Sequence, residues 1–427
     1  MYDLCIIGFG ISGIISAKHA IMNNLKFIIL EKNNDYGGCW YNKAFDFTTL
    51  QTVSSVYQFS DFKKPNYPLY PNKHQILDYL LEYITKYNIN QYVKYNTKVI
   101  QTKWNNYWSI TYEQNTIKKI HSKYILICTG IFNTPNIPNY PFINKFTGKT
   151  YHTTNINKLI PKFKNLDITI IGNGATGLDL ATELNKNNNV TILYRSPKIL
   201  TQRYFLGIST SIIICRLFLY FLKNIPLFLY LIFINLGSKL VFHNYLELPK
   251  QRCNYKLISS NLQIIDLIKK FKITYLKDSI IDINENNIEL KSKNSIKSNV
   301  IIYATGYKHS LPFLDINYPF YTYKFIIHPD IKNCGFIGLC PAYNWIQVIE
   351  IQSLWFINLI KGKINLPNEN IMNQEINTLK QKKKKENIDY YDLIYTSFDY
   401  CETLRSELKL NNYVIKDLGY WLKTPIY

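Results

Sequence analysis

The stretch Asp3-Leu4-Cys5-Ile6-Ile7-Gly8-Phe9-Gly10-Ile11-Ser12-Gly13 decides the fold of this chain. Its apolar start predicts a buried parallel strand, residues 11–22 predict a helix, and residues 25–30 predict the next strand, which ends at Glu31. Three glycines at this spacing permit a tight turn, close approach of the backbone to a pyrophosphate, and packing of the helix on the strand. They are Gly8, Gly10 and Gly13. The pattern predicts a dinucleotide-binding βαβ unit, with the phosphates at the helix N-terminus.

The same pattern occurs a second time. Residues 167–171 predict a strand, residues 175–184 a helix, and residues 190–194 a further strand, which ends before Arg195. The glycines of this unit are Gly172, Gly174 and Gly177. Each of the two fingerprints thus has the strand–turn–helix context that a dinucleotide site requires. The alternative, two βαβ units whose glycine turns bind no ligand, stays open at this point.

The residue that follows the second strand differs between the two units. Glu31 and Arg195 each come 18 positions after the last glycine of their unit. An acid at this position accepts hydrogen bonds from a ribose hydroxyl, whereas an arginine suits a 2′-phosphate. The first site therefore suits an adenosine without a 2′-phosphate, and the second suits NADPH. Two such sites predict electron transfer from NADPH to a second cofactor, most simply FAD.

The length of 427 residues allows two to three domains. We expect an α/β fold of two Rossmann-like dinucleotide-binding domains, the second inserted in the first, with an apolar helical insertion. A predicted strand at 300–307 contains Thr305-Gly306 and resembles an earlier strand that ends in Thr129-Gly130, so the chain is expected to cross back there. The predicted parts are an FAD-binding domain at 1–146 and 297–370, an NADPH-binding domain at 147–296 with the apolar helical insertion at about 205–245, and a polar C-terminal extension at 371–427.

Residues 211–242 are strongly apolar, but Arg216, Lys223 and Pro226 interrupt them. The uncharged stretches are shorter than the roughly 20 residues that a membrane-spanning helix needs. Two structures fit this pattern: a helical hairpin packed on the second domain, or a monotopic surface that enters one leaflet. We therefore expect an intracellular protein that is cytoplasmic or peripherally membrane-associated, with 211–242 as the candidate membrane contact.

The formal net charge of +21 would favour nucleic acid or an acidic membrane as a partner. The basic residues are spread along the chain and form no basic-aromatic motif, so we expect no specific nucleic-acid partner. The run Lys382–Lys385 suits a solvated helix face, although a polybasic patch could also add affinity for anionic lipid.

The eight cysteines include no CxxC pair and no Cys/His cluster with zinc spacing. This is typical of reduced intracellular thiols, and we expect no metal site. The chain begins directly with its first predicted strand, so we expect no signal or transit peptide.

Further motifs follow one another along the chain. They are Gly37-Gly38-Cys39-Trp40, Gln58-Phe59-Ser60-Asp61-Phe62, Phe146-Thr147-Gly148-Lys149-Thr150-Tyr151-His152, Ala304-Thr305-Gly306-Tyr307 with Pro312-Phe313-Leu314, and Glu350-Ile351-Gln352-Ser353-Leu354-Trp355. Together with the two fingerprints, they make the chain resemble the flavin-containing monooxygenases up to about residue 367, and the segment 49–52 is similar to plant-type members.

This resemblance implies a flavin-dependent monooxygenase. NADPH would reduce FAD, O2 would add to the reduced flavin to form a C4a-hydroperoxyflavin, and a soft nitrogen or sulfur nucleophile of a small molecule would take the distal oxygen. The cofactor performs this chemistry, while the protein orients the reactants and excludes water. The resemblance assigns Gly8, Gly10, Gly13, Glu31, Gly38, Cys39 and Trp40 to FAD, and Gly172, Gly174, Gly177 and Arg195 to NADPH.

The chain departs from the family pattern at two positions. Ile156 stands where the motif that ends at His152 continues to an aromatic residue, and the Trp-Pro of the related Baeyer–Villiger enzymes is missing. Ungapped alignment back from Phe59 places Gln51 where animal members carry an asparagine that faces the flavin. Gln51 and Thr52 are therefore the candidate catalytic residues, through hydrogen bonds near the flavin or the nicotinamide. The alternative for both is a loop with local contacts.

Other functions compete with this one. An NADPH-dependent disulfide reductase needs a redox cysteine pair, and Cys39 has no partner at CxxC or CxxxxC spacing. An uncoupled NADPH oxidase and a degenerate, membrane-associated FAD-binding protein without enzymatic activity stay open because of Gln51 and Ile156.

Overall fold

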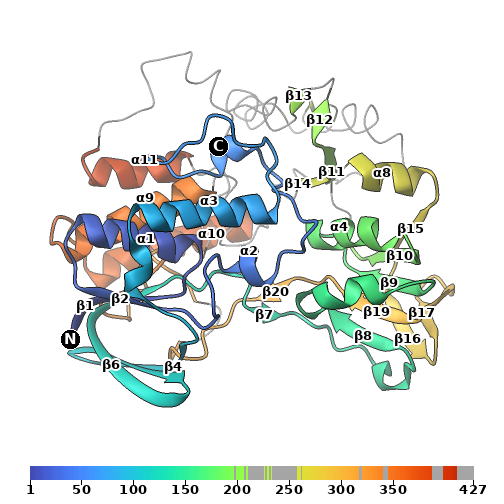
Figure 1. The fold of residues 1–427 in the computed structure, drawn as a ribbon, viewed down its shortest axis with the longest axis horizontal. Helices are drawn as coiled ribbons and strands as arrows, with labels where there is room; N and C mark the ends of the chain where they lie inside the picture. The colour runs from blue at the N-terminus through green and yellow to red at the C-terminus, as the bar shows by residue number, and fades with distance from the viewer. Residues whose placement is uncertain are drawn as a thin grey trace.

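The computed structural model describes residues 1–196, 199–205, 208–209, 226, 228–229, 232, 257–260, 262–316, 320–339, 345–386 and 398–410. These residues form two lobes that lie side by side, each built around its own sheet (Figure 1). The first lobe combines the N-terminal part of the chain with helices from its C-terminal part. The second lobe comes from the middle of the chain.

The sheet of the first lobe has the strand order β3-β2-β1-β6-β5-β4, and β21 also pairs with β6. Its strands are β1 (Tyr2–Ile7), β2 (Phe27–Leu30), β3 (Val93–Lys94), β4 (Lys98–Asn105), β5 (Tyr107–Gln114), β6 (Thr116–Ile127) and β21 (Cys334–Phe336). The strands around β1 are parallel, whereas β4, β5 and β6 form an antiparallel meander. Parallel strands are covered on both faces, and this explains why β1 and β2 are almost entirely apolar.

Helices cover the parallel part of this sheet, and α1 packs directly on α9. The helices of the first lobe are α1 (Ile11–Met22), α2 (Cys39–Asn42), α3 (Lys73–Lys86), α9 (Trp345–Ile360), α10 (Glu369–Glu386) and α11 (Phe398–Glu407). A capping box formed by Asn72 and Gln75 starts α3, since each side chain bonds the backbone N–H of the other.

The sheet of the second lobe is wholly parallel, with the order β15-β10-β9-β19-β8. Its strands are β8 (Lys149–His152), β9 (Asp167–Ile171), β10 (Asn189–Tyr194), β15 (Ile273–Lys277) and β19 (Val300–Tyr303), and its helices are α4 (Ala175–Leu184) and α8 (Leu262–Lys269). The smaller strands of this part are β11 (Ile199–Gln202) paired with β14 (Leu257–Ser260), β12 (Tyr204–Phe205) paired with β13 (Ile208–Ser209), and the sheet of β16 (Ile280–Asn284), β17 (Asn287–Leu290) and β18 (Ser295–Lys297).

The strand pairing moves one predicted boundary. A return to the first domain was expected from residue 297, but β19 lies between β9 and β8 in the second sheet. A buried parallel strand has the same apolar pattern in either sheet, so the sequence alone could not show to which sheet β19 belongs. The chain crosses after β19, where β20 (Tyr307–Lys308) runs antiparallel to β7 (Thr134–Pro135).

The C-terminal part, predicted as a polar extension, contributes side chains to the core of the first lobe. Met372 and Ile376 of α10 and Leu404 of α11 are buried in the main core of the first lobe. The Trp355 indole of α9 donates a hydrogen bond to the Glu407 carboxylate at 2.8 Å. A few apolar residues on one face are enough to pack a helix on a core. The overall polar composition of the segment does not show that these residues share a face.

The apolar segment 211–242 lies outside the described residues except for Pro226, Phe228, Leu229 and Ile232. Within the described part of the chain, no helix is long and apolar enough to cross a membrane.

Candidate active site

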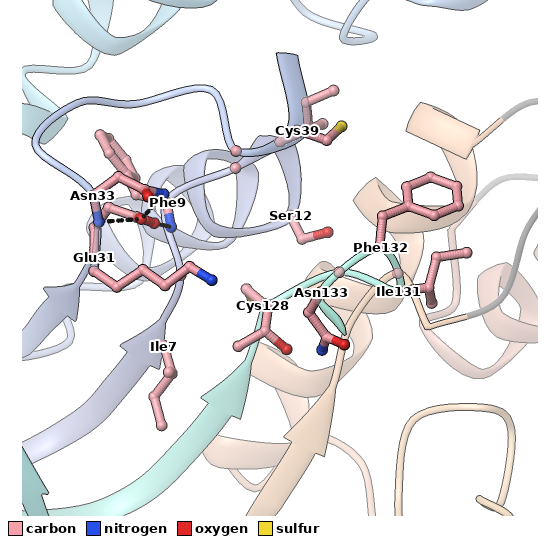
Figure 2. Close-up of a pocket in the computed structure, with 18 of the residues that line it drawn as sticks. Ile7, Phe9, Ser12, Glu31, Asn33, Cys39, Cys128, Ile131, Phe132 and Asn133 are labelled. Carbon is pink, nitrogen blue, oxygen red and sulfur yellow. Dashed lines mark hydrogen bonds between the residues drawn. The ribbon is translucent and has the colours of Figure 1, made fainter. Parts of the chain in front are cut away.

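Glu31 follows β2 at the carboxyl end of the first sheet, and its side chain is buried. One carboxylate oxygen accepts a hydrogen bond from the Phe9 backbone N–H at 2.6 Å. The other accepts from the backbone N–H and the side-chain amide of Asn33, at 2.8 and 2.6 Å (Figure 2). A carboxylate offers about four acceptor positions. The three bonds therefore fix the side chain and leave capacity for one hydroxyl, as a ribose would supply.

The glycines of the first fingerprint have different reasons to be glycine. Gly8 has φ +104°, and a Cβ there would lie 2.7 Å from the Cys128 carbonyl oxygen. A Cβ on Gly13 would lie 2.0 Å from the Gly8 carbonyl oxygen. By contrast, a Cβ on Gly10 would have its nearest contact, the Gly38 Cα, at an ordinary 3.5 Å. Protein packing thus requires Gly8 and Gly13, whereas it leaves room for a Cβ at Gly10. Close approach of a pyrophosphate would be a separate reason for a glycine there.

Helix α1 begins beside these glycines without a side-chain cap. Gly10 is its N-cap residue and has no side-chain acceptor to offer to the first N–H groups. Gly10, Ile11 and Ser12 line a cavity. Free N–H groups and the helix dipole favour an anion at such an end, so this position fits a pyrophosphate.

The cavity extends from Glu31 past the fingerprint to Phe132 (Figure 2). Most of its lining comes from the fingerprint, residues 30–33, residues 37–39 with 42 and 43, residues 128–134 after β6, and residues of the returning chain between 310 and 349. Tyr57 and residues 97–99 also line it. Gly338 of the returning chain has φ +73°, and a Cβ there would lie 2.6 Å from the Ser12 hydroxyl. Its N–H donates to the Gln352 side chain at 3.0 Å, so the motif in α9 holds this turn against the fingerprint.

The Gly37–Trp40 motif lies against the fingerprint. The Gly37 N–H donates to the Phe9 carbonyl at 3.0 Å. Cys39 lines the cavity, and its contact with the cofactor stays a prediction. Trp40 is not among the lining residues; it is buried in the core, and its indole N–H donates to the Tyr57 hydroxyl at 2.7 Å. Tyr57 does line the cavity, so Trp40 acts on the site by positioning Tyr57.

Burial raises the pKa of the Tyr57 hydroxyl above its ordinary value. The protein packed around the Cys39 thiol also raises its pKa, although the residue as a whole is exposed to solvent. The thiol therefore stays protonated at neutral pH. A protonated thiol is a poor nucleophile, and this agrees with the absence of a partner cysteine at disulfide spacing in the sequence.

Gln51 and Thr52 are half-buried, and neither is among the residues that line the cavity. Their loop is held by backbone hydrogen bonds from Leu50 to Pro71 and from Ser54 to Leu69, each 2.8 Å long. Lining residues that no sequence motif indicated include Asn42, Lys43 and Tyr57. Asn42 and Lys43 follow the Gly37–Trp40 motif closely, and Tyr57 directly precedes the Gln58–Phe62 motif, so proximity to a motif was the available signal.

The second fingerprint repeats the geometry of the first. Gly172 has φ +115°, and a Cβ there would lie 2.5 Å from the Ala304 carbonyl oxygen, as Gly8 meets Cys128. A Cβ on Gly177 would lie 2.4 Å from the Gly172 carbonyl oxygen. Helix α4 has Gly174 as its N-cap, again without a side-chain bond. Both helix N-termini are therefore built to face an anion.

Arg195 lies just beyond the end of β10 and is exposed. The Asn173 side-chain amide donates to the Ser196 carbonyl at 3.2 Å and to the Tyr275 hydroxyl at 2.9 Å. These bonds hold the turn that carries Arg195 against the turn of the second fingerprint. An exposed guanidinium at this position suits a phosphate on a nucleotide bound there.

His152 ties the second lobe to the crossing segment. Its Nδ1 accepts the Thr154 backbone N–H at 3.2 Å, so the ring proton is on Nε2, which donates to the Gly306 carbonyl at 3.0 Å. Burial lowers the pKa of His152, which favours this neutral form. Its role is architectural. Ile156, which replaces an aromatic residue of the family motif, is fully buried in the core of the second lobe.

Comparison with known proteins agrees with this geometry. A family described as flavin-binding monooxygenase-like matches residues 2–415. Human flavin-containing monooxygenase 1 is 26% identical over 439 residues, which cover 95% of this chain and 80% of the human protein. The predicted flavin cofactor and the predicted class of enzyme, a flavin-dependent monooxygenase, are thereby confirmed.

Solved structures show the same fold. S-allyl-L-cysteine S-oxygenase from Allium sativum superposes with a TM-score of 0.71 at 17% identity, covering 97% of this chain and 90% of that one. The complex of OTEMO with FAD and NADP gives a TM-score of 0.67 at 16% identity, covering 84% of each chain. Because the family match spans nearly the whole sequence and both lobes, the chain belongs to the flavin-binding monooxygenases.

Proposed function

We propose that this chain is an FAD- and NADPH-dependent monooxygenase that oxygenates a soft nitrogen or sulfur nucleophile of a small molecule. The observation that carries the proposal is the pair of equivalent glycine turns with different residues after them, a buried Glu31 in one and an exposed Arg195 in the other. The first suits FAD, and the second suits NADPH. We further propose that the second lobe is an inserted NADPH domain.

When bound, the flavin supplies the chemistry, because it accepts hydride from NADPH and then carries oxygen to the substrate, through a C4a-hydroperoxyflavin. The residues of the chain hold and orient it. Glu31 would take a ribose hydroxyl and the N-terminus of α1 the pyrophosphate, while Cys39 and Tyr57 line the same cavity. A sulfur substrate is supported by the structural neighbour from Allium sativum, whose substrate is S-allyl-L-cysteine.

Anaerobic titration of the purified, FAD-loaded protein tests the NADPH part of this proposal. We expect NADPH to bleach the flavin absorbance, and NADH to do so at much higher concentration. Dithionite serves as the control, since it reduces any bound flavin. A flavin that dithionite reduces and NADPH does not would contradict the proposed function.

A second candidate function is an uncoupled NADPH oxidase, in which O2 leaves as peroxide. One observation favours it: Gln51 and Thr52, the proposed hydrogen-bonding residues near the flavin, do not line the cavity. Peroxide release per NADPH consumed separates the two functions. If Gln51 supports oxygen transfer, Gln51→Ala will raise this ratio and Gln51→Asn will not, whereas equal ratios in all three proteins would remove Gln51 from the mechanism.

We also propose peripheral membrane contact through residues 211–242. Flotation with neutral and with anionic lipid vesicles tests it, and a protein with 211–242 replaced by a short polar linker is the control. Binding to both vesicle types that the linker variant loses would support the proposal. Binding to anionic vesicles alone, retained in the variant, would instead indicate the general positive charge.

A further inference from the structure

Lys43 follows α2 directly and belongs to the wall of the cavity. Its backbone N–H donates to the Cys39 carbonyl at 3.0 Å, which fixes the start of the side chain beside Cys39. Both residues line the cavity that Glu31 enters from the other side. The cavity therefore contains a lysine that neither glycine fingerprint includes.

The ammonium of Lys43 lies at the end of the cavity away from Glu31. Its Nζ is 4.1 Å from the ring centroid of Tyr307. The Tyr307 ring in turn lies 5.7 Å from the ring of Phe132, which marks the end opposite Glu31 (Figure 2). The ribose site is at Glu31 and the pyrophosphate site at Gly10, so the redox-active ring of a bound FAD occupies the end where Lys43 is.

This end is also where the two lobes meet. Tyr307 belongs to β20, the strand in which the chain crosses back. Three residues earlier, Ala304 packs against Gly172 and Gly177 of the second fingerprint. Lys43 thus extends from the flavin lobe to the segment that supports the nicotinamide site.

Within the described part of the chain, the ammonium has no counter-charge of its own. Among the described residues, no hydrogen bond or ion pair is formed by Nζ, and its one close contact is the face of Tyr307. The titratable groups around it are Lys32, Cys39, Tyr307 and His152, and none of them carries a negative charge at neutral pH. Burial, followed by repulsion from Lys32, lowers the pKa of Lys43 to about 8. Burying a charge without a partner costs free energy, so an anion that binds beside this half-buried ammonium would stabilise it.

We propose that Lys43 is an electrostatic positioning residue of the redox end, and that it stabilises the negative charge which the flavin gains on reduction. This inference rests on the proposed function for the identity of the cofactor. In the hydride step, a C–H bond of the nicotinamide breaks, two electrons and the hydrogen pass to the flavin, and an N–H bond forms. The nicotinamide becomes a cation and the flavin an anion, and the Lys43 ammonium faces that anion. Charge near the flavin ring is a recognised means of tuning its electronics.

The reduction potential of the bound FAD tests this directly. We would reduce wild type, Lys43→Met, Lys43→Arg and Lys98→Met with xanthine oxidase and a reference dye, so that the measurement does not need NADPH. Lys98 is the matched control, because it is an exposed lysine of the same cavity whose neighbour Thr97 bonds the Glu31 carbonyl. Equal flavin content and equal far-UV circular dichroism establish that each variant is folded and loaded.

We expect Lys43→Met to lower the equilibrium constant for reduction about tenfold, which is about 30 mV for a two-electron couple. Lys43→Arg and Lys98→Met are expected to stay within about twofold of wild type. In wild type, the potential is also expected to fall more steeply with pH above about 8, where Lys43 loses its charge, and Lys43→Met will lack this change of slope.

Two results would overturn the inference. The first is a potential that Lys43→Met leaves unchanged, or that Lys98→Met changes as much. The second is a Lys43→Met variant with an unchanged potential that binds FAD or NADP⁺ at least about tenfold more weakly. That result would show that Lys43 binds a phosphate of the cofactor. Failure of the proposed function appears separately, as a flavin with a normal potential that NADPH does not reduce.

Discussion

At the scale of single residues, the two candidate dinucleotide sites carry side chains of opposite charge at the equivalent position. Glu31 is buried and bonded to Phe9 and Asn33, so it presents a fixed acceptor. Arg195 is exposed at the equivalent position of the second unit, where it is free to meet a phosphate. The sign and the exposure of these residues, more than the glycines, distinguish the two sites.

Glu31→Gln is expected to weaken FAD binding. The amide would direct N–H groups toward backbone and side-chain donors that now bond a carboxylate. Loss of charge-assisted hydrogen bonds costs about 1.5–3 kcal/mol, so the dissociation constant should rise by about tenfold or more. Fluorescence titration of the apoprotein with FAD measures this. Equal affinity in wild type and variant would remove Glu31 from the site.

Arg195→Ala is expected to lower the preference for NADPH over NADH by about 2 kcal/mol, since a charge-assisted bond to the 2′-phosphate is lost. Rates of anaerobic flavin reduction with each dinucleotide give the preference. Arg195→Lys serves as the control, because it keeps the charge and should retain part of the discrimination. An unchanged ratio in the alanine variant would show that another residue reads the phosphate.

Sequence could predict residues whose role is set by their own strand or turn, and could not predict those set by a distant contact. The glycines and Glu31 were predicted because their spacing within one βαβ unit defines them. Trp40 was expected beside the cofactor but lies in the core, and Lys43 was missed. Trp40 bonds Tyr57, and Lys43 contacts the ring of Tyr307. The sequence shows neither pair to be neighbours.

At the scale of elements, the strand–turn–helix units explain both the fold and the sites. In each unit, the first glycine contacts the end of a neighbouring strand, and the third contacts the first glycine. The sequence identified these turns and their helices. It did not identify the sheet to which β19 belongs. Parallel strands buried on both faces are all continuous apolar runs, so their sequences do not show which strands they pair with.

The first fingerprint permits a paired test. Gly13→Ala would place a Cβ 2.0 Å from the Gly8 carbonyl oxygen, and we expect an unfolded or strongly destabilised protein. Gly10→Ala meets its nearest atom at 3.5 Å, so it should keep wild-type thermal stability without FAD and bind FAD more weakly. Melting temperature of the apoprotein and FAD titration check the pair. Equal stability of the two variants would contradict the packing argument.

Helix α9 meets the loop after residue 58 through Glu350, whose carboxylate accepts two hydrogen bonds from Ser60, each 3.0 Å long. Burial raises its pKa in the folded state to about 7. Because the folded state then binds more protons than the unfolded state, this group makes the protein less stable as the pH rises from about 4.5 to about 7.

Glu350→Gln removes this proton linkage. The variant is expected to lose less stability than wild type between pH 5 and pH 7.5, as measured by urea unfolding at both values. Identical pH dependence in the two proteins would show that Glu350 does not titrate in this range.

At the scale of the whole molecule, two lobes face each other across the crossing segments. The pairing of β7 with β20 and the bond from His152 to Gly306 hold this connection. The cavity of the first lobe ends near the same place, at Phe132, whose ring packs against that of Tyr307. Under the proposed function, a nicotinamide on the second lobe would approach a flavin in the first across this connection, as electron transfer between two bound dinucleotides requires.

The central claim is that this site carries out oxygen transfer and does not merely hold a flavin. Rapid-mixing absorbance spectroscopy tests it most directly: the FAD-loaded protein is reduced with NADPH and then mixed with oxygenated buffer. The account predicts a long-lived C4a-hydroperoxyflavin that decays faster when an oxidisable sulfide or amine is added. Direct return of oxidised flavin with stoichiometric peroxide, at all oxygen concentrations and in the presence of NADP⁺, would contradict it.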